Sequence, residues 1–99
     1  MFKKNEKNYT DLLGRTNRIV EGTKIEGSIE TNADIRLDGV LVGDLNVSGR
    51  LVIGPKGAVE GDVNCVNADI EGRIKGNVIV KEGLVVKASA MIEGEVTVG

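Results

Sequence analysis

A five-residue unit of the form apolar-x-Gly-x-apolar recurs along this 99-residue chain. The intervals between the central glycines alternate between a shorter and a longer one, so the spacing over two units is nearly constant. A fixed period of this kind is typical of repeat proteins, in which each repeat packs against its neighbours in the chain. The five units are residues 25–29, 41–45, 59–63, 74–78 and 92–96, with their central glycines at Gly27, Gly43, Gly61, Gly76 and Gly94.

The longer period can be checked by shifting the sequence against itself so that Gly43 falls on Gly76, a shift that we call the two-unit offset. Twelve positions from Gly39 to Val63 then fall on an identical residue or on another aliphatic one. A second echo, in which Asn-Ala-Asp-Ile at residues 32–35 recurs at residues 67–70, has a slightly larger offset. We interpret the difference between the two offsets as a small difference in length between turns.

A repeat of about 17 residues is too short for two packed helices, but it suits one turn of a β-coil with three short strands. Apolar residues alternate with polar ones within the units, as at Leu45 and Val47. With 14 glycines, one proline and 2% aromatic residues, the chain favours short aliphatic strands and tight corners. We predict an all-β, single-domain β-solenoid of about five rungs over residues 19–99, preceded by a flexible basic tail at residues 1–18.

The two ends of a solenoid expose one face of a rung unless a cap covers them. The repeat pattern continues to Gly99, so the last rung is expected to offer unpaired backbone and apolar side chains to another copy. Burial of about six side chains at each end would gain about 9–18 kcal/mol, against an association cost of about 4–15 kcal/mol. We therefore predict an end-to-end homopolymer, with a monomer that tolerates exposed ends as the alternative. The predicted polymerisation residues are Ile19, Ile25, Ile29, Ile92, Val96 and Val98.

An enzyme is the main competing hypothesis. Residues 53–61 resemble the hexapeptide repeat of the left-handed acyltransferases, which typically use a histidine base, but this chain has no histidine. Asp62, Glu93 and Glu95 lie beside the repeat glycines, where side chains are expected to face solvent. Cys65 shares the inward parity of Val63 and is expected to be a core residue. We therefore predict no catalytic, metal or cofactor site; an acyltransferase or a monomeric protein-binding adaptor are the alternatives.

Charge is distributed unevenly, with a net +3 over residues 1–18 and −5 over residues 19–99. The acidic body, and the presence of only two aromatic residues in the whole chain, argue against nucleic acid as a partner. No glycine motif has the form of a phosphate-binding loop, so polymerisation is expected to need no nucleotide. One cysteine and the lack of a signal-like or membrane-spanning apolar run predict a cytoplasmic protein.

The basic tail combines two apolar residues with three lysines near its start: Met1, Phe2, Lys3, Lys4 and Lys7. Each lysine near an anionic membrane contributes roughly 1 kcal/mol, so a single tail would bind weakly. Many tails on one polymer would bind firmly, because each added tail acts at high local concentration. We predict a membrane-targeting peptide at these residues, with an ordinary solubilising tail as the alternative.

Three stretches, residues 22–29, 34–45 and 57–63, resemble the bactofilin domain, and the likeness covers residues 19–99. The resemblance implies a right-handed triangular β-helix that forms nucleotide-independent, non-polar filaments at the inner face of the cytoplasmic membrane. It also implies a scaffold that supports cell shape or recruits peptidoglycan-modifying enzymes. Family members often place a phenylalanine in the C-terminal polymerisation face. The only phenylalanine here is Phe2, so the contact would rest on aliphatic residues.

Overall fold

The computed structural model describes residues 16–99, which form thirteen β-strands and, within that range, no helix. The first two rungs of the coil are β1 (Thr16–Ile19), β2 (Lys24–Glu26) and β3 (Ile29–Thr31), then β4 (Asp34–Leu37), β5 (Val40–Val42) and β6 (Leu45–Val47). The third is β7 (Arg50–Ile53), β8 (Ala58–Glu60) and the start of β9 (Val63–Ile70). The fourth rung consists of the end of β9, then β10 (Arg73–Lys75) and the start of β11 (Val78–Val86). The fifth rung consists of the end of β11, then β12 (Met91–Glu93) and β13 (Val96–Val98).

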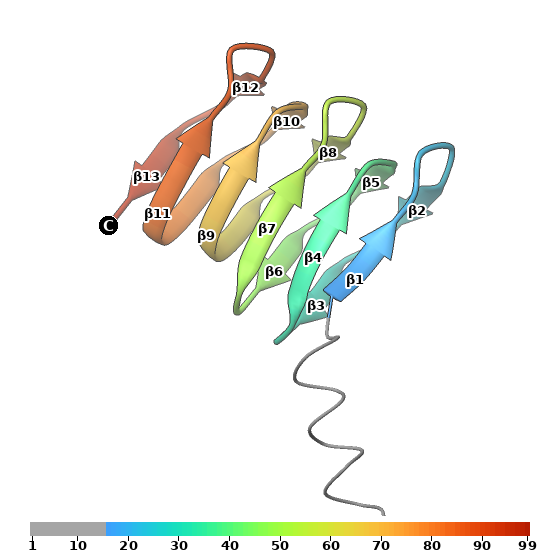
Figure 1. Ribbon diagram of the computed structural model, residues 1–99, viewed down its shortest axis with the longest axis horizontal. Coiled ribbons are helices and arrows are strands. Elements are labelled where there is room, and N and C mark those ends of the chain that lie inside the picture. The colour runs from blue at the N-terminus through green and yellow to red at the C-terminus, as the bar shows by residue number, and fades with distance from the viewer. Residues whose placement is uncertain (1–15) are drawn as a thin grey trace, which may run out of the picture.

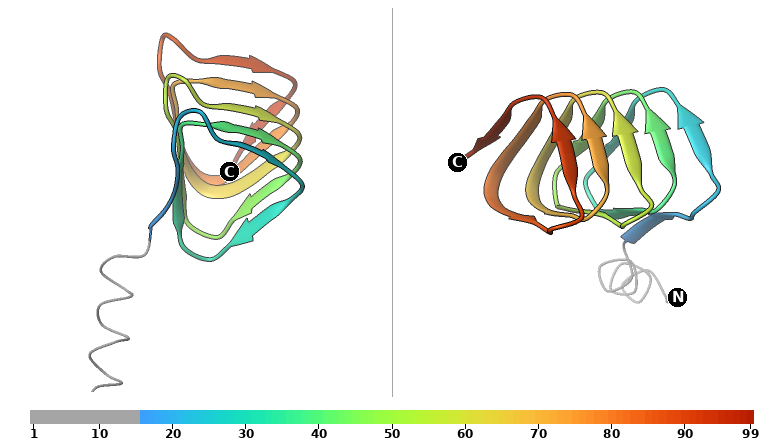
Figure 2. Two further views of the ribbon diagram at one scale, coloured as in Figure 1. Left: turned by 90° about the vertical axis from the view of Figure 1, so that its right-hand side faces the viewer. Right: turned by 90° about the horizontal axis from the view of Figure 1, so that it is seen from above.

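The strands stack into three faces, which makes the coil triangular (Figure 1). The first face holds β1, β4, β7 and the ends of β9 and β11, and the second holds β2, β5, β8, β10 and β12. The third face holds β3, β6, the starts of β9 and β11, and β13. Every pairing is parallel, and seen from the N-terminal end the chain turns clockwise as it recedes, so the coil is right-handed (Figure 2). The predicted β-solenoid of about five rungs is confirmed.

The core consists of five inward positions per rung, stacked in columns. Leu41 pairs with Val59, and Val59 pairs with Ile74, so aliphatic side chains lie over one another inside the coil. Three inner rungs with five such positions account for the whole set of buried apolar residues, and no polar side chain is buried among residues 16–99. The columns of the inner rungs are Ile35, Leu51 and Ala68; Leu37, Ile53 and Ile70; Leu41, Val59 and Ile74; Leu45, Val63 and Val78; and Val47, Cys65 and Val80.

The repeat glycines form the corner between the second and third faces. Gly61 has φ +152°, and a Cβ on it would overlap the carbonyl oxygen of Gly43 in the preceding rung. The residue after the glycine ties the corner to the next rung through its side chain. Asp62 accepts a hydrogen bond from the backbone N–H of Asn77 at 3.1 Å, and Asn77 accepts one from Glu95 at 3.1 Å. The repeat glycines of the sequence therefore stand over one another, rung by rung, at this corner.

The two-rung period arises at the corner between the first and second faces. Four residues form this corner in the first, third and fifth rungs, at residues 20–23, 54–57 and 87–90, and Figure 1 shows these as the larger loops. Two residues suffice in the second and fourth rungs, at residues 38–39 and 71–72. The two-unit offset seen in the sequence is therefore the spatial register between the second and fourth rungs and between the third and fifth, and the first and third rungs differ from it by one residue.

The second echo, whose offset is slightly larger, does not correspond to the spatial register. Ile35 stands over Leu51 and Leu51 over Ala68, so Ile35 and Ile70 occupy different columns. The two-unit offset equates Asp34 with Asn67, and both accept a backbone N–H of the following rung, at 2.9 and 3.1 Å. Identical letters at the larger offset therefore do not mark equivalent positions in the stack.

The first rung begins earlier than the predicted boundary at residue 19. β1 starts at Thr16 and pairs with β4 from Thr16↔Asp34 to Ile19↔Leu37, so residues 16–18 belong to the solenoid. The sequence pattern misses this strand because Asn17 occupies an inward position that is apolar in every other rung. The remaining residues of the predicted tail lie outside the described range.

Candidate assembly interface

The C-terminal rung leaves the end of the core open. Its five inward residues are all aliphatic, yet Val86, Val96 and Val98 remain 49%, 42% and 48% exposed because no other rung of residues 16–99 covers them. Val78, one rung earlier in the column of Val96, is 0% exposed. β12 and β13 also pair on one side only, so their outer edges carry peptide groups available for hydrogen bonding. The inward residues of this rung are Leu84, Val86, Ile92, Val96 and Val98.

Within residues 16–99 no rung covers the N-terminal rung either, but its surface is different. Ile19, Ile25 and Ile29 are half-buried at three of its inward positions. The other two positions hold Asn17 and Thr31, whose side chains meet: Asn17 Nδ2 donates to Thr31 Oγ1 at 3.1 Å. One end of the core is therefore wholly aliphatic, whereas the other carries a polar pair at one corner.

All six residues proposed from the sequence for polymerisation occupy inward positions of the two end rungs. Three lie at each end, and each stands at the end of a buried column. Sequence reasoning missed Leu84 and Val86, although the two-unit offset already placed them on the inward residues Leu51 and Ile53. The five residues proposed for membrane targeting, Met1, Phe2, Lys3, Lys4 and Lys7, lie outside the described residues.

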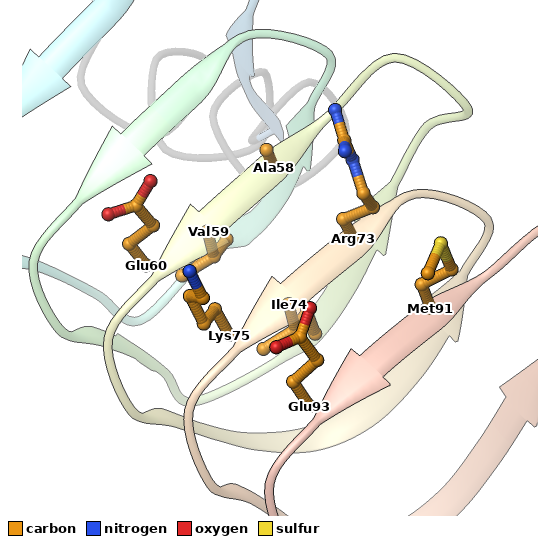
Figure 3. A pocket seen from close by; sticks show the side chains of 8 residues that line it. All are labelled: Ala58, Val59, Glu60, Arg73, Ile74, Lys75, Met91 and Glu93. Carbon is orange, nitrogen blue, oxygen red and sulfur yellow. The ribbon is translucent and has the colours of Figure 1, made fainter.

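The second face carries a shallow hollow of about 180 Å³ between β8, β10 and β12 (Figure 3). Ala58, Arg73 and Met91 form one row of outward side chains, with Glu60, Lys75 and Glu93 in the other. Val59 and Ile74 point to the opposite side, into the core. Lys75 stands between the two glutamates in register, so it attracts both and leaves the row with a net charge of −1. No cysteine, serine or histidine lines the hollow, so its lining offers no nucleophile of these kinds.

Acidic side chains concentrate at the corner between the second and third faces. They flank the repeat glycines and are all exposed, which confirms the solvent-facing positions expected for Asp62, Glu93 and Glu95. Only Lys75 adds a positive charge at these flanking positions. With Lys75, this acidic edge has a net charge of −5, which equals the net charge of residues 19–99, and it consists of Glu26, Asp44, Glu60, Asp62, Glu93 and Glu95.

Charges on the first face are paired instead. Arg36 and Asp38 form an ion pair at 2.8 Å, and Arg50 and Asp69 form one at 3.0 Å. The hydrogen bonds to Asp38 raise the pKa of Arg36 above its ordinary value. All four side chains are at least partly exposed to solvent, which screens the attraction within each pair.

Cys65 confirms its prediction as a core residue. Its side chain points from the third face into the core and is 3% exposed. Burial raises the pKa of the thiol from 9.0 to about 11. The thiol therefore stays protonated at neutral pH and is a poor nucleophile. Within residues 16–99 no group of three or more histidine, cysteine or carboxylate side chains could hold a metal ion. The same residues include no helix long and apolar enough to span a membrane.

Comparisons with known proteins place this geometry in a family. A family model described as bactofilin, polymer-forming cytoskeletal, matches residues 17–99. Bactofilin BacO of Myxococcus xanthus is 26% identical over 72 residues, which are 73% of this chain and 57% of BacO. The chain thus spans little more than half the length of that relative.

Two solved structures share the fold. A crystal structure of a mutant bactofilin from Thermus thermophilus has a TM-score of 0.78 and 27% identity, over 84% of this chain and 91% of that one. The solid-state NMR structure of the cytoskeletal bactofilin BacA has a TM-score of 0.64 and 26% identity, over 85% of this chain and 96% of that one. The family match covers nearly the whole described solenoid, so this chain belongs to the bactofilin family of polymer-forming cytoskeletal proteins.

Proposed function

We propose that this protein is a scaffold that polymerises end to end without nucleotide and lies on the inner face of the cytoplasmic membrane. The observation that carries the proposal is the open C-terminal rung, whose aliphatic residues continue five core columns to the surface. A second copy placed against this end would cover the exposed side chains of those columns.

The gain from that contact is moderate. Val86, Val96 and Val98 are each roughly half-exposed, so covering them gains about 1 kcal/mol per side chain, or about 6 kcal/mol for the three on each of two copies. Association costs about 4–15 kcal/mol, and edge hydrogen bonds and the other end-rung residues supply the remainder. Polymerisation should therefore depend on protein concentration. Confinement to a membrane would raise the local concentration and so favour the polymer.

Electron microscopy of the purified protein without nucleotide tests the polymer. We expect filaments, and we expect Val96→Arg to shorten or remove them, because a charge at the end of the core cannot be buried without a partner. Ile79→Arg is the matched control: Ile79 points outward on β11 and is 46% exposed, so this change adds the same charge away from the ends. Filaments of unchanged length in Val96→Arg would place the contact elsewhere.

The membrane part of the proposal rests on the sequence of the tail. Several tails on one polymer would act together at high local concentration, whereas one tail with three lysines would bind weakly. The solenoid itself is acidic over residues 19–99 and is not expected to bind anionic lipid. The acidic edge would then face the cytoplasm, where it is available to scaffolded partners such as cell-wall enzymes.

Flotation with vesicles that contain anionic lipid tests the tail. A triple variant of the tail should no longer float with the vesicles: Lys3→Gln, Lys4→Gln and Lys7→Gln. A matched triple variant removes the same charge from exposed positions on the solenoid and should still float: Lys56→Gln, Lys81→Gln and Lys87→Gln. Equal flotation of both triple variants would show that the tail is not the anchor. Vesicles of neutral lipid should bind none of these proteins.

A further inference from the structure

The two ends of the solenoid differ in two of the five core columns. One column holds Ile35, Leu51, Ala68 and Leu84 but starts with Asn17 in the first rung. Another holds Val47, Cys65, Val80 and Val98 but starts with Thr31. The two columns adjoin at the corner between the third and first faces. The polar residues therefore lie side by side at one end of an otherwise aliphatic core.

These two side chains make only part of their possible hydrogen bonds within residues 16–99. Asn17 Nδ2 donates to Thr31 Oγ1 at 3.1 Å and to the backbone oxygen of Asp34 at 3.3 Å. Thr31 Oγ1 also accepts the backbone N–H of Ala33 at 3.0 Å. The pair bridges the first and third faces across the end of the core, and we call it the polar cap. A copy stacked on this end would bury these groups and remove the water from their remaining polar atoms, a free-energy cost that aliphatic side chains do not have.

The C-terminal end carries no such cost. Its five inward residues are aliphatic and have no polar group to desolvate, and three of them are more than 40% exposed. The N-terminal end offers three half-buried isoleucines and the polar cap. The best match for the aliphatic surface on the described part of the chain is the same surface of a second copy, because only there are all five inward positions apolar.

We infer that the Asn17–Thr31 polar cap weakens N-terminal association, so that copies pair first through their C-terminal rungs and the N-terminal contact extends the polymer only at higher concentration. The inference rests on the proposed end-to-end assembly and adds the order in which the two contacts form. Polar groups that lose water on burial without gaining a hydrogen bond weaken an association constant by about ten- to a hundredfold, which is the expected difference between the ends.

Sedimentation velocity of the full chain over a concentration series measures the two contacts separately. Ile25→Arg blocks the N-terminal end and Val96→Arg blocks the C-terminal end, with Ile29→Arg and Val98→Arg as substitutes if either variant fails to fold by circular dichroism. We expect Ile25→Arg to form dimers at concentrations where Val96→Arg is monomeric. The double variant Ile25→Arg/Val96→Arg should be monomeric throughout, which shows that the dimers form through the ends.

Removal of the polar cap should strengthen the weaker contact. In the Val96→Arg background, Asn17→Leu together with Thr31→Val should lower the dimer dissociation constant by about ten- to a hundredfold. Glu30→Val is the control, because Glu30 is exposed on the same strand as Thr31 but points away from the core. It should leave Val96→Arg monomeric.

Two results would overturn the inference: equal dissociation constants for Ile25→Arg and Val96→Arg, or no tightening when the polar cap is removed. A different result identifies failure of the proposed function itself. If the unsubstituted protein sediments as a monomer at every concentration, there is no end-to-end assembly for the polar cap to modulate.

Discussion

Substitution of the corner glycines by alanine tests the stacking of the rungs. Gly27 and Gly61 occupy the same corner with φ +131° and +152°, a region that L-residues rarely adopt, so alanine at either site costs about 1–3 kcal/mol of backbone strain. They differ in what surrounds the added methyl. At Gly27, in the first rung, a Cβ meets no atom within 4 Å, whereas at Gly61 it overlaps the carbonyl of Gly43.

The steric part of the effect therefore belongs to Gly61 alone. Forcing a methyl between two stacked backbones costs about 1–3 kcal/mol, comparable with overpacking of a core, so Gly61→Ala should lose about 2–6 kcal/mol and Gly27→Ala about 1–3 kcal/mol. The effect on the unfolded chain, which alanine makes stiffer than glycine, is the same for both and cancels in the comparison.

Guanidinium unfolding followed by circular dichroism measures the difference. Both substitutions should be made together with Ile25→Arg and Val96→Arg, so that association does not add to the measured free energy of unfolding. A loss of stability that is equal in the two variants would mean that the close approach of Gly61 to Gly43 does not limit the packing of the rungs, and the reasoning would be wrong.

Three further predictions follow from side chains in or near the core. Leu51→Ala should lower the free energy of unfolding by about 2–5 kcal/mol, because Leu51 is fully buried. Val52→Ala, on the outer face of β7, should change it by less than about 1 kcal/mol. Similar losses for the two variants in denaturant titrations would contradict the assignment of the columns. Asp62→Ala should cost about 0.5–1.5 kcal/mol in the same titrations, because the backbone N–H of Asn77 loses its acceptor. Asp62→Asn should retain most of that stability, since an amide oxygen accepts the same hydrogen bond. Equal losses in the two variants would show that the charge of Asp62 matters. Burial holds the pKa of Cys65 at about 11, above the ordinary 9.0, so the thiol of the unfolded chain ionises first and the free energy of unfolding should fall as pH rises from about 9 to 11. Unfolding titrations at several pH values should show this slope in the unsubstituted protein and a smaller one in Cys65→Val. Identical slopes would exclude the thiol as the cause.

Most of the solenoid could be predicted from the sequence because its periodicity is local. Alternation of apolar residues, as at Leu45 and Val47, sets which side chains point inward, and the glycine spacing sets one corner of every rung. The two-unit offset even identified the true register, since long and short corners alternate and every second rung has nearly the same length. The end-rung candidates followed from this register, because the last members of an apolar column have no rung above them.

The tertiary structure alone decided what happens where the pattern breaks. Asn17 and Thr31 look like ordinary polar residues in the sequence, but stacking places both at inward positions and lets them hydrogen-bond across the open end. The second echo, of Asn-Ala-Asp-Ile, looked equally meaningful and is not in register, because pairing between rungs depends on corner lengths that no short stretch reveals. The sequence by itself determined the coil and its aliphatic columns, since these depend on neighbours along the chain. The difference between its two ends depends on which residues the coil brings together, and only the folded structure could show it.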